Sequence, residues 1–69
     1  MEKIRDCIGR IACKGDAATG LIETVYKRQK TRTKIPVGEK LIIERENTVT
    51  TVTRINSNAF HVESHNYVA

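Results

Sequence analysis

The sequence predicts an α+β protein, in which an N-terminal amphipathic helix packs on a small, curved, mostly antiparallel β-sheet of about four strands. Two observations lead to this prediction: residues 2–13 place apolar side chains at helical spacing, and residues 38–64 alternate short β-branched runs with plausible reversals. An SH3-like barrel fits a similar number of strands. The 69 residues make one small domain, which divides into a helix at about 2–14, a loop at 15–20, a β-rich part at 21–64 and a tail at 65–69.

The N-terminal segment has the pattern of an amphipathic helix. Its apolar residues Ile4, Cys7, Ile8 and Ile11 recur at intervals of three and four, with charged residues between them. Gly9 lies inside this segment, where glycine costs a helix about 1 kcal/mol relative to alanine. Its presence there indicates that another backbone approaches the helix closely.

A second helix over residues 16–30 is the alternative prediction, with Asp16 as its cap. It would give two helices followed by a β-meander, an outline similar to that of a winged helix. Against it, Gly20 would lie inside the helix, where it is unfavourable. The segments 24–26 and 31–33 are also rich in β-branched residues, which favours strands.

The expected meander consists of three runs, residues 39–46, 48–55 and 59–64. In the last run Phe60 and Val62 alternate with polar residues, so we expect them to face inward. Val52 and Ile55 in the middle run are three residues apart, which strict alternation places on opposite faces. Either a β-bulge shifts the register or both faces of the run are partly covered, and we predict the bulge.

Turn-forming residues separate these runs. Asparagine tolerates a positive φ and bonds its own backbone, which indicates reversals at residues 46–47 and 56–58. Residues 36–38, Pro-Val-Gly, open the meander, because proline presets one turn angle and lacks the amide donor that a sheet ladder needs. A preceding strand is thus expected to end near Ile35.

Composition and charge limit the classes of function. The formal net charge of +4 favours polyanionic partners such as nucleic acid, although small proteins also use such a charge for solubility. Cys7 and Cys13 follow no signal-peptide pattern, so we expect a reduced, cytoplasmic setting. The longest aliphatic run is Leu41-Ile42-Ile43, far too short to span a membrane, and no membrane association is expected.

The densest chemical feature is the stretch from Lys27 to Lys34, which holds five cations in eight residues and no acid. On an extended strand, alternate cations would lie on one face about 6.6 Å apart, a spacing suited to the phosphates of a nucleic-acid strand. Tyr26 borders the stretch and could stack on an exposed base. The candidate nucleic-acid-binding residues are therefore Tyr26, Lys27, Arg28, Lys30, Arg32 and Lys34. The alternative is an edge strand whose charges only prevent aggregation.

The sequence offers no pattern for catalysis, metal binding or a cofactor. His61 and His65 have no cysteine pair at zinc-finger spacing, and no nucleophile comes with a positioned base. A glycine-rich loop for a phosphate cofactor is also missing. We therefore expect no enzymatic activity, no cofactor and no metal.

Two functions fit these observations. The first is a small basic nucleic-acid-binding or regulatory module that contacts phosphate through residues 27–34. The second is a protein-interaction module, such as an accessory, inhibitor or dimerising protein, in which the basic stretch only provides solubility. The expected partners are thus nucleic acid or a larger protein, with a homodimer as a further form.

Overall fold

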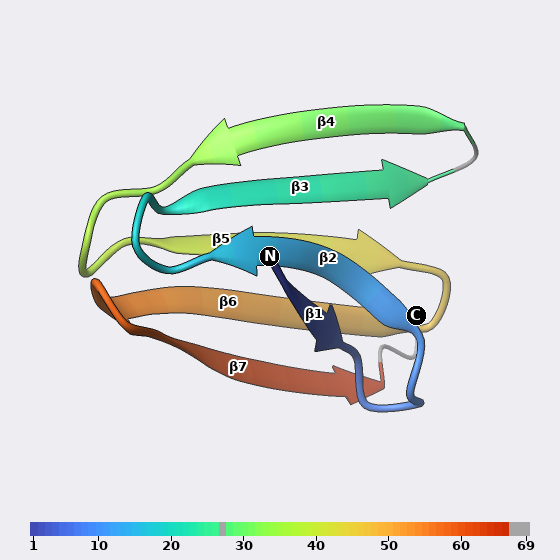
Figure 1. Cartoon of the computed structure of the whole chain (residues 1–69). Coiled ribbons are helices and arrows are strands. Elements are labelled where there is room, and N and C mark those ends of the chain that lie inside the picture. The colour runs from blue at the N-terminus through green and yellow to red at the C-terminus, as the bar shows by residue number, and fades with distance from the viewer. Residues whose placement is uncertain (27, 67–69) are drawn as a thin grey trace.

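The structure is a computed structural model that describes residues 1–26 and 28–66, apart from the side chain of Tyr26. Within these residues the chain forms seven β-strands and no helix (Figure 1). The strands are β1 (Glu2–Arg5), β2 (Ile11–Asp16), β3 (Leu21–Tyr26), β4 (Gln29–Lys34), β5 (Lys40–Arg45), β6 (Thr48–Asn56) and β7 (Ala59–Asn66). The strands β1 to β4 form one antiparallel sheet in chain order, and β5 to β7 form a second.

The α+β prediction is therefore wrong, and the protein is all-β. The segment expected as a helix at 2–14 is a β-hairpin, in which Ile4 of β1 lies opposite Cys13 of β2. The winged-helix-like alternative is wrong as well, because residues 16–30 include β3 and the start of β4. The sheet of about four strands accounts for only part of the chain, which continues into a second sheet of three strands.

A side-chain-capped turn explains why the N-terminal segment is a hairpin. The Asp6 carboxylate accepts hydrogen bonds from the backbone N–H of Ile8 at 3.1 Å and of Arg10 at 2.9 Å. Gly9 completes the turn with a φ of +88°, a left-handed conformation that glycine adopts without strain. No atom lies within 4 Å of where its Cβ would be, so the predicted close approach of a backbone is wrong. Gly9 serves the turn instead.

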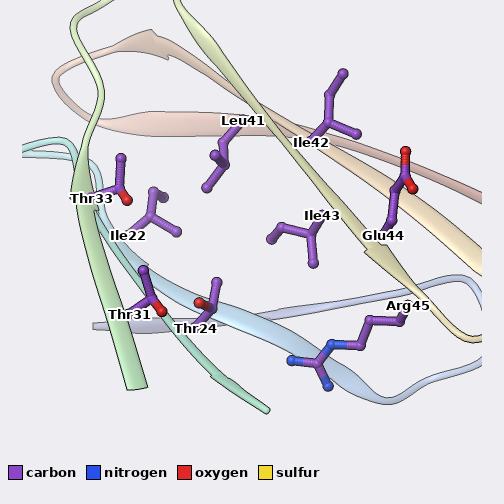
Figure 2. Close-up of a pocket in the computed structure, with 9 residues that line it drawn as sticks. All are labelled: Ile22, Thr24, Thr31, Thr33, Leu41, Ile42, Ile43, Glu44 and Arg45. Atoms are coloured by element: carbon purple, nitrogen blue, oxygen red, sulfur yellow. The ribbon is translucent and has the colours of Figure 1, made fainter. Parts of the chain in front are cut away.

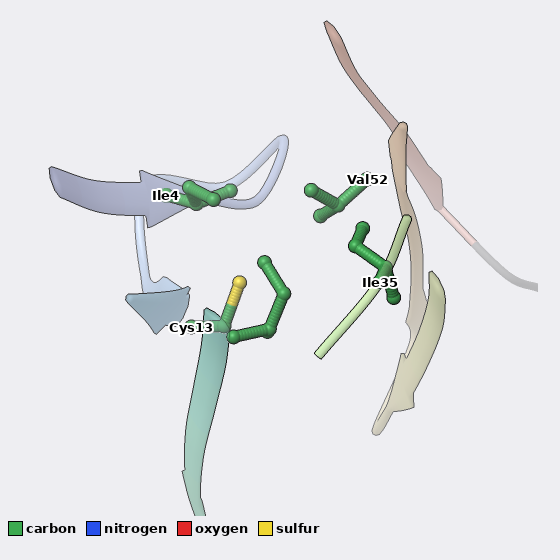
Figure 3. Close-up of a cluster of buried hydrophobic side chains, with 5 residues drawn as sticks. Ile4, Cys13, Ile35 and Val52 are labelled. Carbon is green, nitrogen blue, oxygen red and sulfur yellow. The ribbon is translucent and has the colours of Figure 1, made fainter. Parts of the chain in front are cut away.

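The hydrophobic core lies between the inner faces of the two sheets. Figure 3 shows Ile4 and Cys13 from the four-stranded sheet pointing toward Val52 from the other, with Ile35 of the connecting segment beside them. Ile22 of β3 completes this buried cluster and is 1% exposed. The core is small, so the protein needs further contacts to hold the sheets together.

The C-terminal sheet follows the predicted meander. The register of β6 and β7 shifts between Arg54 and Asn56, which places a bulge at Ile55 and confirms the predicted bulge. Val52 is buried, whereas Ile55 is exposed. Asn47 has a φ of 68°, as expected for a reversal after β5.

Arginine side chains join the two sheets at their ends. Arg54 of β6 donates to the carbonyl oxygens of Ala17 and Ala18 at 2.9 and 3.0 Å, and to that of Ile35 at 3.1 Å. At the other end, Arg10 donates to Glu46 O and to Thr48 Oγ1. These hydrogen bonds connect the two sheets, and they are stronger than neutral hydrogen bonds because their donors are charged.

A third arginine, Arg45 of β5, contacts the four-stranded sheet at the place where β2 and β3 stop pairing. The pairing of β2 with β3 runs from Asp16–Leu21 only as far as Lys14–Glu23. Beyond it, one Arg45 Nη2 atom donates to Ala12 O at 3.1 Å and to Val25 O at 2.9 Å. The guanidinium thus supplies donors to carbonyls on both strands at the point where their ladder ends.

The buried Asp6 carboxylate makes the stability depend on pH. Burial acts to raise its pKa, but the hydrogen bonds from Arg10 and Ile8 and the Arg10 charge outweigh burial, so the pKa lies below its ordinary value of 3.8. A group with a lowered folded pKa stabilises the fold above the unfolded pKa and loses that contribution as the pH falls through the folded value. We therefore expect the Asp6→Asn variant to be about 2 kcal/mol less stable than the wild type at pH 7.

Urea unfolding of both proteins between pH 7 and pH 2 measures this difference. The gap between them should stay constant down to about pH 5 and then narrow as the pH falls below the ordinary Asp pKa. All other carboxylates are the same in the two proteins, so their contributions to the pH dependence cancel in the difference. A gap that stays the same at every pH would show that the ionised Asp6 carboxylate does not stabilise the turn.

The described residues contain no helix that is long and apolar enough to cross a membrane.

Candidate nucleic-acid interface

Alternation along the strands sorts the cations of the four-stranded sheet onto its outer face. Ile4, Cys13 and Ile22 face the core, so their chain neighbours Lys3, Lys14 and Glu23 face outward. We call this outer surface the basic face and define it by the cations Lys3, Lys14, Lys30, Arg32 and Lys34.

The ladder register brings cations of different strands side by side. Lys3 of β1 lies opposite Lys14 of β2, which in turn lies opposite Glu23 of β3. Glu23 is opposite Arg32 of β4. One row across all four strands therefore carries three cations and one carboxylate.

β4 adds a column of cations that runs along the edge of the sheet. Lys30, Arg32 and Lys34 lie opposite Val25, Glu23 and Leu21, respectively, and so share the outer face. All six residues of β4 are exposed. These three cations of the predicted site are brought together as predicted, about 6.6 Å apart along the strand.

Glu23 holds two of these cations in place. Its carboxylate lies 3.4 Å from Lys30 Nζ and 3.1 Å from Arg32 Nε. Partial burial acts to raise the pKa of Glu23, but the Arg32 hydrogen bond and the charges of Lys30 and Arg32 outweigh burial and lower the pKa. The side chains of Lys30 and Arg32 nevertheless remain 53% and 62% exposed, so both can also reach an anion from solvent.

The other predicted residues are placed as follows. Arg28 is exposed immediately before β4, with a φ of 69°. Lys27 and the side chain of Tyr26 lie outside the described part of the chain, so their predicted contacts with phosphate and base stay predictions. Arg45 and Arg54 do not extend this basic face, because their guanidinium groups bond backbone carbonyls between the sheets.

Sequence reasoning missed Lys3 and Lys14 as members of the basic face. It assigned both to the N-terminal helix, whereas each belongs to a strand whose outer side continues from β4. The sequence did contain a sign of this pairing, because the Asp16–Gly20 segment is compatible with a hairpin turn between two short strands. That interpretation would have placed Lys14 near Glu23.

The remaining chemically active residues are dispersed. Burial raises the pKa of the Cys13 thiol to about 11, so it stays protonated at neutral pH. His61 lies on the outer face of the second sheet, where its Nε2 is 3.0 Å from Glu63 Oε1. Within residues 1–26 and 28–66, no three His, Cys, Asp or Glu residues group as a metal site.

The basic face can bind anionic oxygens, because its exposed ammonium and guanidinium groups donate charge-assisted hydrogen bonds. Asp16 lies at one end of the face opposite Leu21, and its carboxylate accepts the Ala18 N–H within the turn. Cations therefore outnumber carboxylates across the described surface of this sheet. No protein-family model, curated protein or solved structure matches this chain.

Proposed function

We propose that the protein is a small, non-catalytic nucleic-acid-binding module of the cytoplasm that contacts phosphate through its basic face. The observation that carries the proposal is the column of Lys30, Arg32 and Lys34 at two-residue intervals on one exposed strand. A regular line of cations suits a polyanion whose charges also repeat regularly along a line. Such binding contacts the phosphates of the nucleic acid and not its bases, so we expect weak sequence preference and strong dependence on salt.

The ion pairs of Glu23 affect phosphate binding in two opposite ways. Long cationic side chains lose rotamer freedom when they bind phosphate, and Glu23 already restricts Lys30 and Arg32 on the outer face. The same carboxylate also competes with phosphate for these two cations. Glu23 is thus expected to lower affinity while it orders the site.

The test compares two variants whose net charge is lowered by the same two units. Lys30→Gln/Lys34→Gln removes two cations of the column, and Lys40→Glu lowers the net charge by the same two units at an exposed position on the outer face of the second sheet. Each would be titrated against fluorescent single- and double-stranded oligonucleotides at several salt concentrations. For the column variant we expect about a tenfold or greater loss of affinity at low salt, and a log–log salt slope that is shallower by about 2.

The Lys40→Glu control should retain most of the affinity of the wild type. Glu23→Gln is a further variant with the opposite expected sign, because it releases Lys30 and Arg32 to bind phosphate. Its binding should tighten by about threefold or more at low salt. The proposal is wrong if the wild type does not bind at low salt, or if Lys40→Glu weakens binding as much as Lys30→Gln/Lys34→Gln.

A further inference from the structure

The segment between β4 and β5 leaves one side of the molecule open. These strands follow each other in the chain but do not pair, so each ends its own sheet. A groove of about 250 Å³ lies between them. Figure 2 shows Thr31 and Thr33 of β4 on one side of this groove and Leu41 and Ile43 of β5 on the other.

The groove has an apolar floor and a hydroxyl-lined wall. Ile22, Leu41 and Ile43 provide the apolar surface, which is continuous with the buried core. Thr31 and Thr33 are both exposed. An occupant of this groove would therefore need apolar side chains that point inward between the sheets.

β4 differs from the other described strands because every residue in it is exposed, on both of its faces. Its inner face presents threonines to the groove, and its outer face presents Lys30, Arg32 and Lys34. Along its free side, the backbone groups that do not pair with β3 remain available to another strand. A strand added there would have one face over the groove and one face beside the cations.

The charges on β4 argue against a second copy of the same strand. Antiparallel pairing of two β4 strands about a two-fold axis puts residues of the same face opposite each other. Each cation of one copy would then lie opposite a cation of the other, which is destabilising. An acidic strand has the complementary charge.

We propose that β4 accepts an extended segment of a partner protein in which acidic and apolar residues alternate. The acidic side chains lie on the outer face beside Lys30, Arg32 and Lys34, and the apolar side chains enter the groove over Ile22 and Leu41. Backbone hydrogen bonds to the free side of β4 hold the segment, as in other cases of strand addition. This interaction is distinct from phosphate binding because it requires the groove as well as the cations.

Two fluorescent peptides of seven residues test the proposal on the full chain. One alternates glutamate and valine, beginning and ending with glutamate, and the other holds the same residues with the three valines in one central block. Fluorescence anisotropy should show at least tenfold tighter binding of the alternating peptide. Hydrogen exchange by NMR should show new protection of β4 amides that do not bond to β3.

A matched pair of variants examines the groove itself. Thr33→Trp fills the groove without a change in charge, and Thr53→Trp makes the same replacement on the outer face of the second sheet. The first should weaken the alternating peptide at least tenfold, and the second should leave it unchanged. Circular dichroism checks that both variants remain folded.

Several results would overturn the proposal: equal binding of the two peptides, unchanged peptide affinity in Thr33→Trp, or no new protection in β4. Oligonucleotide binding, measured on the same Thr33→Trp protein, reports separately on the basic face. Binding of oligonucleotides but not of the alternating peptide would reject strand addition and leave the phosphate-binding proposal intact. Binding of the peptide alone would do the reverse.

Discussion

Replacement of Gly20 by alanine is expected to destabilise the fold by at least about 3 kcal/mol, a large part of the stability of so small a protein. Gly20 has a φ of +78°, and a Cβ there would overlap the carbonyl oxygen of Ile35. It would also lie 2.7 Å from Arg54 Nη1. The backbone cannot move away easily, because Gly20 O accepts the Ile35 N–H at 2.9 Å. Urea unfolding at pH 7 measures the loss.

Gly9→Ala is a matched control for this substitution. Gly9 has a similar φ of +88°, but a Cβ added there would meet no atom within 4 Å. The Gly9→Ala variant should therefore lose only about 1 kcal/mol of stability, the cost of alanine in a left-handed conformation. Equal losses in the two variants would show that backbone conformation alone, and not the contact with Ile35 and Arg54, makes glycine necessary at position 20.

Arg54→Met should cost about 3 kcal/mol, because it removes the charged donors that join β6 to the other half of the molecule. Methionine keeps an apolar stem of similar length, so packing is largely retained. The carbonyl oxygens of Ala17 and Ile35, both buried residues, would lose their bonds from the guanidinium. Chemical denaturation gives the change in stability.

Arg5→Met provides the comparison for this second substitution. Arg5 is exposed and donates to one carbonyl, that of Gly9 within its own hairpin. Its replacement should change stability by less than about 0.5 kcal/mol. If Arg54→Met were as stable as Arg5→Met, the contacts of Arg54 between the sheets would contribute little to the fold.

The C-terminal sheet could be predicted from the sequence because its signals are local. The alternation in β7 and the asparagine at position 47 each depend on a few neighbouring residues. A bulge was predicted in β6 and is found at Ile55, but it does not bring Val52 and Ile55 to one buried face, because Ile55 is exposed. Periodicity and turn chemistry agreed in this part of the chain.

The N-terminal hairpin could not be predicted in the same way. Ile4, Ile8 and Ile11 have helical spacing, yet Ile8 and Ile11 are exposed and only Ile4 enters the core. The partner of Ile4 is Cys13, outside the periodic set that suggested a helix. The decisive interaction is a carboxylate that caps its own turn, and hydrophobic periodicity carries no information about such a bond.

The candidate site was predictable in part. Alternation alone placed Lys30, Arg32 and Lys34 on one face of a strand. The ion pairs of Glu23 depend on the register between β3 and β4. A glycine-containing turn would have indicated this register, but residues 27–28 contain no glycine. Lys14 joined the face only through the pairing of β2 with β3.

The order of the strands has a consequence for how this chain folds. Every ladder joins strands that are consecutive in the chain, so each sheet can form by closing short loops, which costs little conformational entropy. The contacts of Arg54 and Arg10 between the sheets link residues 19 to 38 positions apart, and they can form only when the two sheets dock. Docking is thus the step at which distant parts of the chain first meet, and these arginines act on it rather than on the ladders.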